Sequence, residues 1–299
     1  MATGTGGAGG ERGVLLWGTA PVIVSMTSLC IGSSFAKSLF PLVGAVGMTG
    51  LRNGLSAVLM TLVFRPWRWR LDARRWRIAL LYGVILGVMN TCFYLALARL
   101  PIGVAIALEF VGPLGVALFS SARRLDLLWV ALAAAGVALL ALPGTGAAAL
   151  DPIGVGFVAV AAAAWAAYIV VGQRAARLMS GAQAVSIGLW AAALVSVPLA
   201  LADAGAVLVR PAVLAQGMVV AVLCSAVPYP LELAALRRLP ARVFGVLVSL
   251  EPAIGALAAM AVLGERLTGA QWLAIALVVA ASAGVTLTHQ AGPAPAPSS

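Results

Sequence analysis

Charged residues are scarce in this chain of 299 residues: 9% are Asp, Glu, Lys or Arg, whereas 63% are hydrophobic. A soluble domain carries about 25% charged residues, which it needs to cover a surface in contact with water. The mean hydropathy of +1.07 points in the same direction. The composition therefore excludes an ordinary soluble domain and predicts an integral membrane protein whose solvent is largely lipid.

The side chains that usually build enzymatic and metal sites are also scarce. Histidine occurs once, at His289, lysine occurs once, at Lys37, and the three cysteines lie far apart inside apolar runs. The cysteines form no C-x-x-C pair, so their spacing predicts neither a disulfide framework nor a metal site. Lys37 does not end a glycine-rich loop, which excludes a Walker A motif and direct drive by ATP. We therefore expect no metal, no cofactor and no enzyme, and an intramembrane enzyme with paired carboxylates is a distant alternative.

The net charge of +10 is carried by basic residues in the short gaps between apolar runs. Nucleic-acid-binding proteins gather such charges on one face, often with aromatic residues between them, and this chain does not. Anionic lipid headgroups account better for charges in this position. The expected partner is the lipid bilayer, and no nucleic acid is expected.

Ten apolar stretches are long enough to cross a hydrocarbon core about 30 Å thick, at about 1.5 Å per helical residue. Seven of them contain no charge: 13–36, 78–98, 127–150, 152–173, 178–202, 211–231 and 267–288. Three others are each interrupted by one charge: 38–64 by Arg52, 100–122 by Glu109 and 243–264 by Glu251. The sequence therefore predicts an all-α membrane protein with ten transmembrane helices.

Basic residues are distributed unequally between alternate gaps. If the N-terminus lies in the cytoplasm, the inner gaps hold 14 basic residues and the outer gaps hold 4. The inner segment 65–77 alone carries six arginines, with three tryptophans among them. Cytoplasmic loops carry such an excess, and tryptophan favours the headgroup region. Both termini are therefore predicted to be cytoplasmic, with disordered tails at 1–12 and 290–299.

Two segments of the chain resemble each other. Residues 99–113 and 238–252 both begin with Arg-Leu-Pro, end in a proline 14 residues after the arginine, and carry a glutamate shortly before it. These are spans four and nine, so the repeat unit is five helices, covering 13–143 and 151–289. An odd number of helices inverts the second copy across the membrane, as in many secondary transporters with a site near the midplane. Chance similarity between apolar segments is the alternative.

Four charged residues are predicted to lie within the membrane: Arg52, Glu109, Glu232 and Glu251. A charge at the bilayer centre costs about 2.5–3.5 kcal/mol on insertion scales, so such residues usually face the bundle interior or a wet cavity. Arg52 either binds a substrate carboxylate through two hydrogen bonds or pairs with a glutamate as a structural lock. Glu232 lies closer to an interface, where a solvated charge is the alternative.

Four prolines lie within four residues of these carboxylates: Pro113, Pro228, Pro230 and Pro252. Proline has no N–H, so each one leaves a backbone carbonyl without its helical partner. Broken helices are tolerated at membrane depth where they line a cavity. A carboxylate beside a freed carbonyl suits an ammonium group or a proton.

Four uncharged polar residues complete the candidates for substrate or ion binding: Asn53, Asn90, Tyr94 and Tyr229. Asn90 and Tyr94 are one helical turn apart on span three, and Trp165 and Tyr168 are similarly placed on span six. Such pairs line a pore in one interpretation. In the other they pack helices together or anchor the chain at the interface.

Several motifs resemble a known family. They are the run from Leu100 through Glu109 to Leu114, the Val-Pro-Tyr-Pro-Leu-Glu run at 227–232, the run 238–253, and Leu-Gly-Glu-Arg-Leu-Thr at 263–268. From about 13 to 289 the chain resembles the drug/metabolite transporter superfamily, specifically EamA-type exporters of the threonine/homoserine branch. That branch has Pro-Tyr-Ser-Leu-Glu where this chain has an additional proline, Pro230.

The resemblance implies ten helices, cytoplasmic termini and export across the bacterial cytoplasmic membrane, driven by the proton gradient. The main hypothesis is a proton-coupled exporter of a small amino acid such as threonine or homoserine. Its carboxylate would lie near Arg52 and its ammonium near Glu109 or Glu251. The alternatives are an exporter of drugs or other amphiphiles and a non-transporting scaffold or receptor, and the protein is expected to be a monomer or a homodimer.

Overall fold

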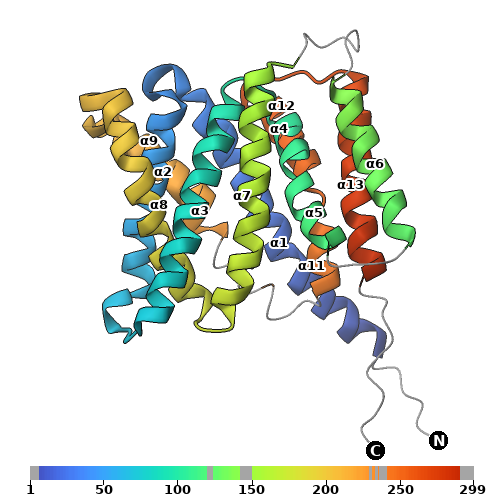
Figure 1. Ribbon diagram of the computed structural model, residues 1–299, viewed down its shortest axis with the longest axis horizontal. Helices are drawn as coiled ribbons and strands as arrows, with labels where there is room; N and C mark the ends of the chain where they lie inside the picture. Colours follow the sequence, from blue (N-terminus) through green and yellow to red (C-terminus); the bar gives the residue numbers. More distant parts are fainter. Residues whose placement is uncertain are drawn as a thin grey trace, which may run out of the picture.

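The computed structural model of the chain describes residues 7–119, 124–141, 150–228, 231, 232, 235 and 241–289. Within these ranges every regular element is a helix and there is no strand. The helices run along one another in a single bundle (Figure 1). The all-α prediction is therefore confirmed.

The helices form two halves, each of which contributes five membrane spans. The first half contains α1 (Gly7–Ser38), α2 (Phe40–Phe64), η1 (Pro66–Arg68), α3 (Ala73–Leu97), α4 (Ile102–Glu109), α5 (Val111–Phe119) and α6 (Arg124–Ala141). The second half contains α7 (Pro152–Ala176), α8 (Gly181–Ala204), η2 (Gly205–Val209), α9 (Pro211–Ala221), η3 (Val222–Ala226), α11 (Ala241–Val248), α12 (Glu251–Leu263) and α13 (Gly269–His289).

Ten apolar helical segments account for the predicted spans. Seven are long and apolar enough to cross a membrane, and three shorter apolar helices cover Ile102–Val116, Leu127–Leu139 and Pro211–Ala226. The prediction of ten transmembrane helices is thus confirmed. Helix α1 begins at Gly7, so residues 7–12, which composition assigned to a tail, are helical. Residues 1–6 and 290–299 lie outside the described part of the chain.

The two halves interlock rather than forming separate bundles. Equivalent spans pack against each other: α2 against α8, α4 against α12, and α6 against α13. Contacts between non-equivalent spans also occur twice, once for each copy. The contact of α3 with α7 corresponds to that of α9 with α1, and the contact of α3 with α8 corresponds to that of α9 with α2. This pattern is the one expected of two inverted copies related by a twofold axis in the membrane plane. The inverted five-helix repeat is confirmed.

Small residues allow the helices to approach closely. A β-carbon added at Gly83 on α3 would lie 2.2 Å from the carbonyl oxygen of Gly188 on α8. One added at Gly112 on α5 would lie 2.1 Å from the carbonyl oxygen of Ala162 on α7. Small residues are common at such contacts in membranes, because helix association depends on close packing of the backbones.

The charges separate the two ends of the bundle. The first turn of α1, the last turn of α13, and the α2–α3 and α7–α8 connections all lie at one end, at the bottom of Figure 1. We call this the arginine-rich end, because it carries these arginines in the two connections and in the adjoining helical turns: Arg65, Arg68, Arg70, Arg74, Arg75, Arg77, Arg174 and Arg177. The other end is called the opposite end.

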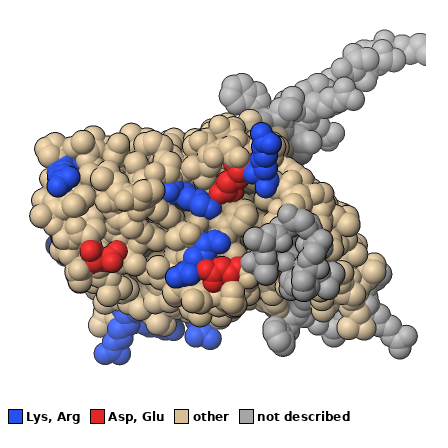
Figure 2. Space-filling model, turned by 90° about the horizontal axis from the view of Figure 1, so that it is seen from above, with Lys and Arg blue, Asp and Glu red and all other residues tan. Residues whose placement is uncertain are grey.

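The opposite end carries few charges, and several of them are paired. Figure 2 looks onto this end and shows a mostly uncharged face, with basic and acidic atoms adjoining at two places near its middle. Two ion pairs belong to this end: Lys37 Nζ lies 2.7 Å from Glu265 Oε1, and Arg99 Nη1 lies 2.6 Å from Asp151 Oδ2.

Candidate functional site

The fourth span is interrupted in its middle. Helix α4 ends at Glu109 and α5 begins at Val111, with Phe110 as a turn between them. Pro113 has no N–H to donate to the carbonyl of Glu109, and helical bonding continues from Leu114 N to Phe110 O at 3.1 Å. The break therefore places the Glu109 side chain beside the backbone carbonyl of the same residue, which lacks its usual helical donor.

The ninth span has the matching interruption. Helix α11 ends at Val248 and α12 begins at Glu251, with two turn residues between them. Pro252 occupies one of the first two positions of α12, where its missing N–H costs no helical bond. The two glutamates thus flank related breaks, but Glu109 ends a helix whereas Glu251 begins one.

The eighth span is distorted as well. Residues Val222–Ala226 form one π-helical turn, closed by a bond of 2.9 Å from Val227 N to Val222 O. Pro228 follows at once and cannot donate to the carbonyl of Cys224. Residues 231 and 232 are helical again, so Glu232 lies just beyond this distortion. Tyr229 and Pro230 lie outside the described residues.

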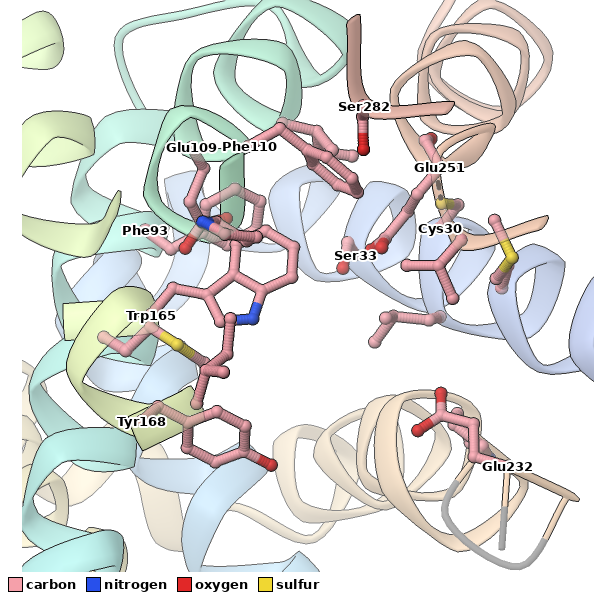
Figure 3. A pocket seen from close by; sticks show the side chains of 18 of the residues that line it. Cys30, Ser33, Phe93, Glu109, Phe110, Trp165, Tyr168, Glu232, Glu251 and Ser282 are labelled. Carbon is pink, nitrogen blue, oxygen red and sulfur yellow. Dashed lines mark hydrogen bonds between the residues drawn. The ribbon is translucent and has the colours of Figure 1, made fainter. Parts of the chain in front are cut away.

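The three distortions surround one cavity of about 450 Å³. All four charged residues expected within the membrane contribute to its wall, together with Asn90: Arg52, Glu109, Glu232 and Glu251. Figure 3 shows Glu109 on one side of the open space and Glu251 and Glu232 on the other. The structure therefore gathers on one surface ionisable side chains that come from spans two, four, eight and nine.

Arg52 is held against an aromatic ring. Its side chain is 7% exposed, and its Nη1 donates to Tyr94 Oη at 3.3 Å. Its guanidinium carbon also lies 5.4 Å from the centroid of the same ring, in the range of a cation–π contact. Tyr94 is fully buried behind Arg52 and does not line the cavity. Its role in the structure is to orient the guanidinium.

A chain of amides ties the wall of the cavity to the helices behind it. Asn90 Nδ2 donates to Asn53 Oδ1 at 3.0 Å, and Asn53 Nδ2 donates to Ser196 Oγ at 3.1 Å. Asn90 lines the cavity, whereas Asn53 is fully buried behind it. These bonds join α2, α3 and α8, so they fix the orientation of Asn90 and of the helix that carries Arg52.

Two other acidic residues of the wall, Glu232 and Glu251, are contacted by α1. Ser25 Oγ on α1 donates to Glu232 Oε1 at 2.8 Å. The thiol of Cys30, one further turn along α1, lies 3.9 Å from the backbone carbonyl of Glu251. Helix α1 therefore contacts Glu232 and the backbone of Glu251, the two acidic residues that the second half contributes to the cavity.

Sequence reasoning did not identify several residues of the wall. On α1 the cavity is lined by Met26, Cys30 and Ser33, and on the α4–α5 break by Phe110. The spacing of three and four residues along α1 places those side chains on one face of a helix. That signal was present in the sequence, but in a membrane helix an apolar face does not reveal whether it contacts lipid or a cavity.

The cavity extends toward the arginine-rich end. Its lining reaches Phe244 and Thr286, each three residues from the terminus of its helix at that end. Toward the opposite end the chain is packed tightly: Leu97 and Ile102 are fully buried, and Leu100 is 2% exposed. The described conformation is therefore closed at the opposite end.

A polar latch, formed by Lys37 and Glu265, crosses the closed end. Lys37 Nζ donates both to Glu265 Oε1 and to the carbonyl oxygen of Leu100, each at 2.7 Å. Glu265 Oε2 accepts from the backbone N of Ile102 at 3.0 Å. Helix α4 has Pro101 before its first turn and no side-chain cap of its own, so Glu265 supplies that cap and lies at the positive end of the helix dipole.

A second, more exposed pair supports the same end. Arg99 donates to Asp151, and Asp151 also accepts from the backbone N of Ile153 at 2.8 Å, which caps α7. The hydrogen bond from Arg99 lowers the pKa of Asp151, with a further contribution from the backbone N–H groups of α7. This pair connects the α3–α4 turn of the first half with the first helix of the second half.

Comparison with known proteins shows what the chain is similar to. Residues 152–287 match the EamA-like transporter family. The threonine/homoserine exporter RhtA of Escherichia coli K12 is 48% identical over 268 residues, which cover 89% of this chain and 90% of that protein. RhtA of Salmonella typhimurium LT2 is 46% identical over 273 residues, covering 91% of this chain and 92% of that protein.

A solved crystal structure shares the fold at 23% identity. It superposes with a TM-score of 0.58 and covers 92% of this chain and 98% of that one. The family match and the two relatives confirm the resemblance inferred from the motifs of spans four, eight and nine. The chain belongs to the EamA-like transporter family.

Proposed function

We propose that the protein is a secondary active exporter that carries a small amino acid, such as threonine or homoserine, out of a bacterial cell in exchange for protons. The relatives at 46–48% identity are named threonine/homoserine exporters. The observation that carries the proposal is the single cavity lined by both an arginine and several carboxylates. An amino acid is a zwitterion, so it needs a cationic and an anionic partner at once.

The size and chemistry of the cavity agree with such a substrate. Ligand sites in proteins commonly have volumes of about 300–1,000 Å³, and the cavity of about 450 Å³ falls in the lower part of this range. The planar guanidinium of Arg52 suits a carboxylate, to which it can donate two parallel hydrogen bonds. Glu109 and Glu251 then provide the partner for the ammonium group.

The distribution of charge supports an orientation of the protein in the membrane that agrees with export. Cytoplasmic loops are rich in arginine and lysine, so the arginine-rich end is assigned to the cytoplasm, with both termini there. The cavity extends toward that end and is closed at the other. In this orientation the described conformation is the one that loads substrate from the cytoplasm.

Proton coupling is supported by the grouping of several carboxylates around one cavity. Carboxylates close together in a medium of low dielectric repel one another, so each of them favours the binding of a positive charge. A proton and the ammonium group of the substrate both supply that charge, and they therefore compete for the same carboxylates. If each ligand favours a different conformation, the competition couples their movements in opposite directions.

The proposal is tested by transport in proteoliposomes with an imposed pH gradient. We expect Glu109→Gln and Glu251→Gln each to reduce proton-driven threonine flux at least tenfold, because the neutral amide neither binds a proton nor neutralises an ammonium. Asp203→Asn is the matched control, since Asp203 is an exposed carboxylate near the end of α8. Undiminished proton-driven flux in both cavity variants would overturn the coupling role.

Export of apolar amphiphiles is the second candidate, and the aromatic and methionine side chains of the wall favour it. Met26, Met89, Phe93 and Phe110 all line the cavity, and methionine adapts to many apolar ligands. A panel of amino acids and cationic dyes, offered to cells that lack their own exporters, separates the two candidates. Dye efflux without amino-acid efflux would replace the first with the second.

A further inference from the structure

Trp165 on α7 projects into the cavity. Figure 3 shows its indole ring reaching toward the open space that Glu109 and Glu251 border from different sides. The ring lies on the same face of α7 as Tyr168, which also lines the cavity.

Neighbouring aromatic residues hold this part of the wall in place. The Trp165 ring meets Phe110 edge to face, with centroids 4.9 Å apart and an interplanar angle of 86°. One turn along α7, the ring of Tyr168 stacks on Tyr82 at 4.5 Å, and their hydroxyl groups are hydrogen-bonded. Because Phe110 follows Glu109 at the break of span four, the indole is anchored beside one of the acidic groups of the site.

The indole N–H is available to an occupant of the cavity. Within the described ranges, no protein group accepts a hydrogen bond from Trp165 Nε1. In contrast, Trp190 on α8 donates its Nε1–H to Thr61 Oγ1 at 2.7 Å. An indole N–H that faces a protein interior usually finds an acceptor. A donor left open toward a cavity is therefore suited to an oxygen atom of the ligand.

We propose that Trp165 contacts the substrate and determines specificity. Its Nε1–H donates to the side-chain hydroxyl oxygen of the transported amino acid, while its ring limits the length of that side chain. The proposal rests on the proposed amino-acid export and names the class of substrate within it: short amino acids with a hydroxyl group. A site built to hydrogen-bond a hydroxyl group discriminates well against an analogue that lacks it.

The test compares pairs of amino acids that differ in the hydroxyl group, threonine with valine and homoserine with 2-aminobutyrate. The purified full-length protein in proteoliposomes is expected to prefer the hydroxylated member of each pair. Trp165→Phe keeps an apolar ring and removes the donor, so the preference should fall by about three- to tenfold. Trp165→Ala should in addition admit leucine and phenylalanine, because it removes the ring that limits side-chain length.

Trp190→Phe is the matched control. It makes the same chemical change at a side chain that is 43% exposed, so the preference for hydroxylated substrates should be unchanged. If the Trp165→Phe variant does not fold, Trp165→Leu takes its place, because leucine also lacks a hydrogen-bond donor. A wild-type protein that transports threonine and valine equally well, or a Trp165→Phe variant with undiminished preference, overturns the role of Trp165. A wild-type protein that moves no amino acid overturns the proposed function itself.

Discussion

The two ends of the bundle differ in what holds them. At the opposite end, the latch of Lys37 and Glu265 lies over tightly packed residues, among them Leu100 and Ile102. At the arginine-rich end, the lining of the cavity extends to within a turn of the ends of α11 and α13. One end is closed by polar contacts between separate segments, and the cavity extends toward the other.

This difference indicates which contacts must break for the closed end to open. The latch joins α1 and the α3–α4 turn of the first half to the α12–α13 turn of the second half. Ion pairs and hydrogen bonds near a surface exchange readily for bonds to water, whereas a large apolar core does not. We infer that the latch separates when the cavity opens to the opposite side, as an alternating-access mechanism requires.

Removal of Glu265 should have the largest effect on the closed end. Glu265→Ala removes the ion pair with Lys37 and the cap of Ile102 N, and bonds to charged groups contribute about 1.5–3 kcal/mol each. The population that is open to the opposite side should rise at least tenfold. The measurement is the rate at which a membrane-impermeant thiol reagent, added on that side, modifies Cys30 and Cys224, which line the cavity.

This labelling experiment needs a background without Cys92, which is partly exposed and does not line the cavity. Cys92→Ala therefore accompanies each variant, and the same protein with Glu265 intact provides the reference. Equal labelling rates with and without Glu265 would contradict a gating role for the latch.

Removal of Lys37 should have a smaller effect. Lys37→Met keeps the length of the side chain and removes its bonds to Glu265 and to the carbonyl of Leu100, but Glu265 still caps α4 through Ile102 N. One of the three hydrogen bonds of the latch survives, the one from Ile102 N to the charged carboxylate of Glu265, so a rise of about three- to fivefold in labelling of Cys30 is expected. A rise larger than that of Glu265→Ala would show that the bond from Lys37 to the carbonyl of Leu100 contributes more than the cap on α4, and would contradict this ranking.

The architecture of the protein could be predicted from the sequence because its signals are local. Charge-free runs, isolated charges such as Glu109 and Glu251, and nearby prolines each depend on a few adjacent residues. The inverted repeat followed from comparing two short segments. The same signals predicted where spans four and nine break, since each break has a proline beside its glutamate and proline cannot donate a helical hydrogen bond.

The latch and the arrangement of the wall could not be predicted in this way. Lys37 and Glu265 are 228 residues apart, and no local pattern pairs them. Asn53 was grouped with Arg52 as a candidate, yet it lies behind the wall. Adjacent residues of a helix point about 100° apart, so one of them can face the cavity while the other faces a neighbouring helix. Which of the two faces inward depends on packing against α3 and α8, which a single sequence does not reveal.

The exposed pair of Arg99 and Asp151 should have the smallest effect of the three contacts at the closed end. Exposed ion pairs usually contribute little to stability, so Asp151→Asn should change the labelling of Cys30 by less than about twofold. The pKa of Asp151 is lowered in the folded protein, chiefly by Arg99. Its stabilising contribution is therefore complete above the usual pKa of aspartate, about 3.9, and is lost only as the pH falls through the lower folded value.

It follows that the difference in labelling between wild type and Asp151→Asn should be constant from pH 7 to pH 5. Both proteins are labelled side by side in the Cys92→Ala background, and the rates are divided by those of a small thiol to remove the pH dependence of the reagent. A difference that disappears between pH 7 and pH 5 would mean that a group other than Asp151 controls the closed end. The carboxylates of the cavity, Glu109 and Glu251, would then be the first to substitute, because the proposed exchange with protons requires that they respond to pH.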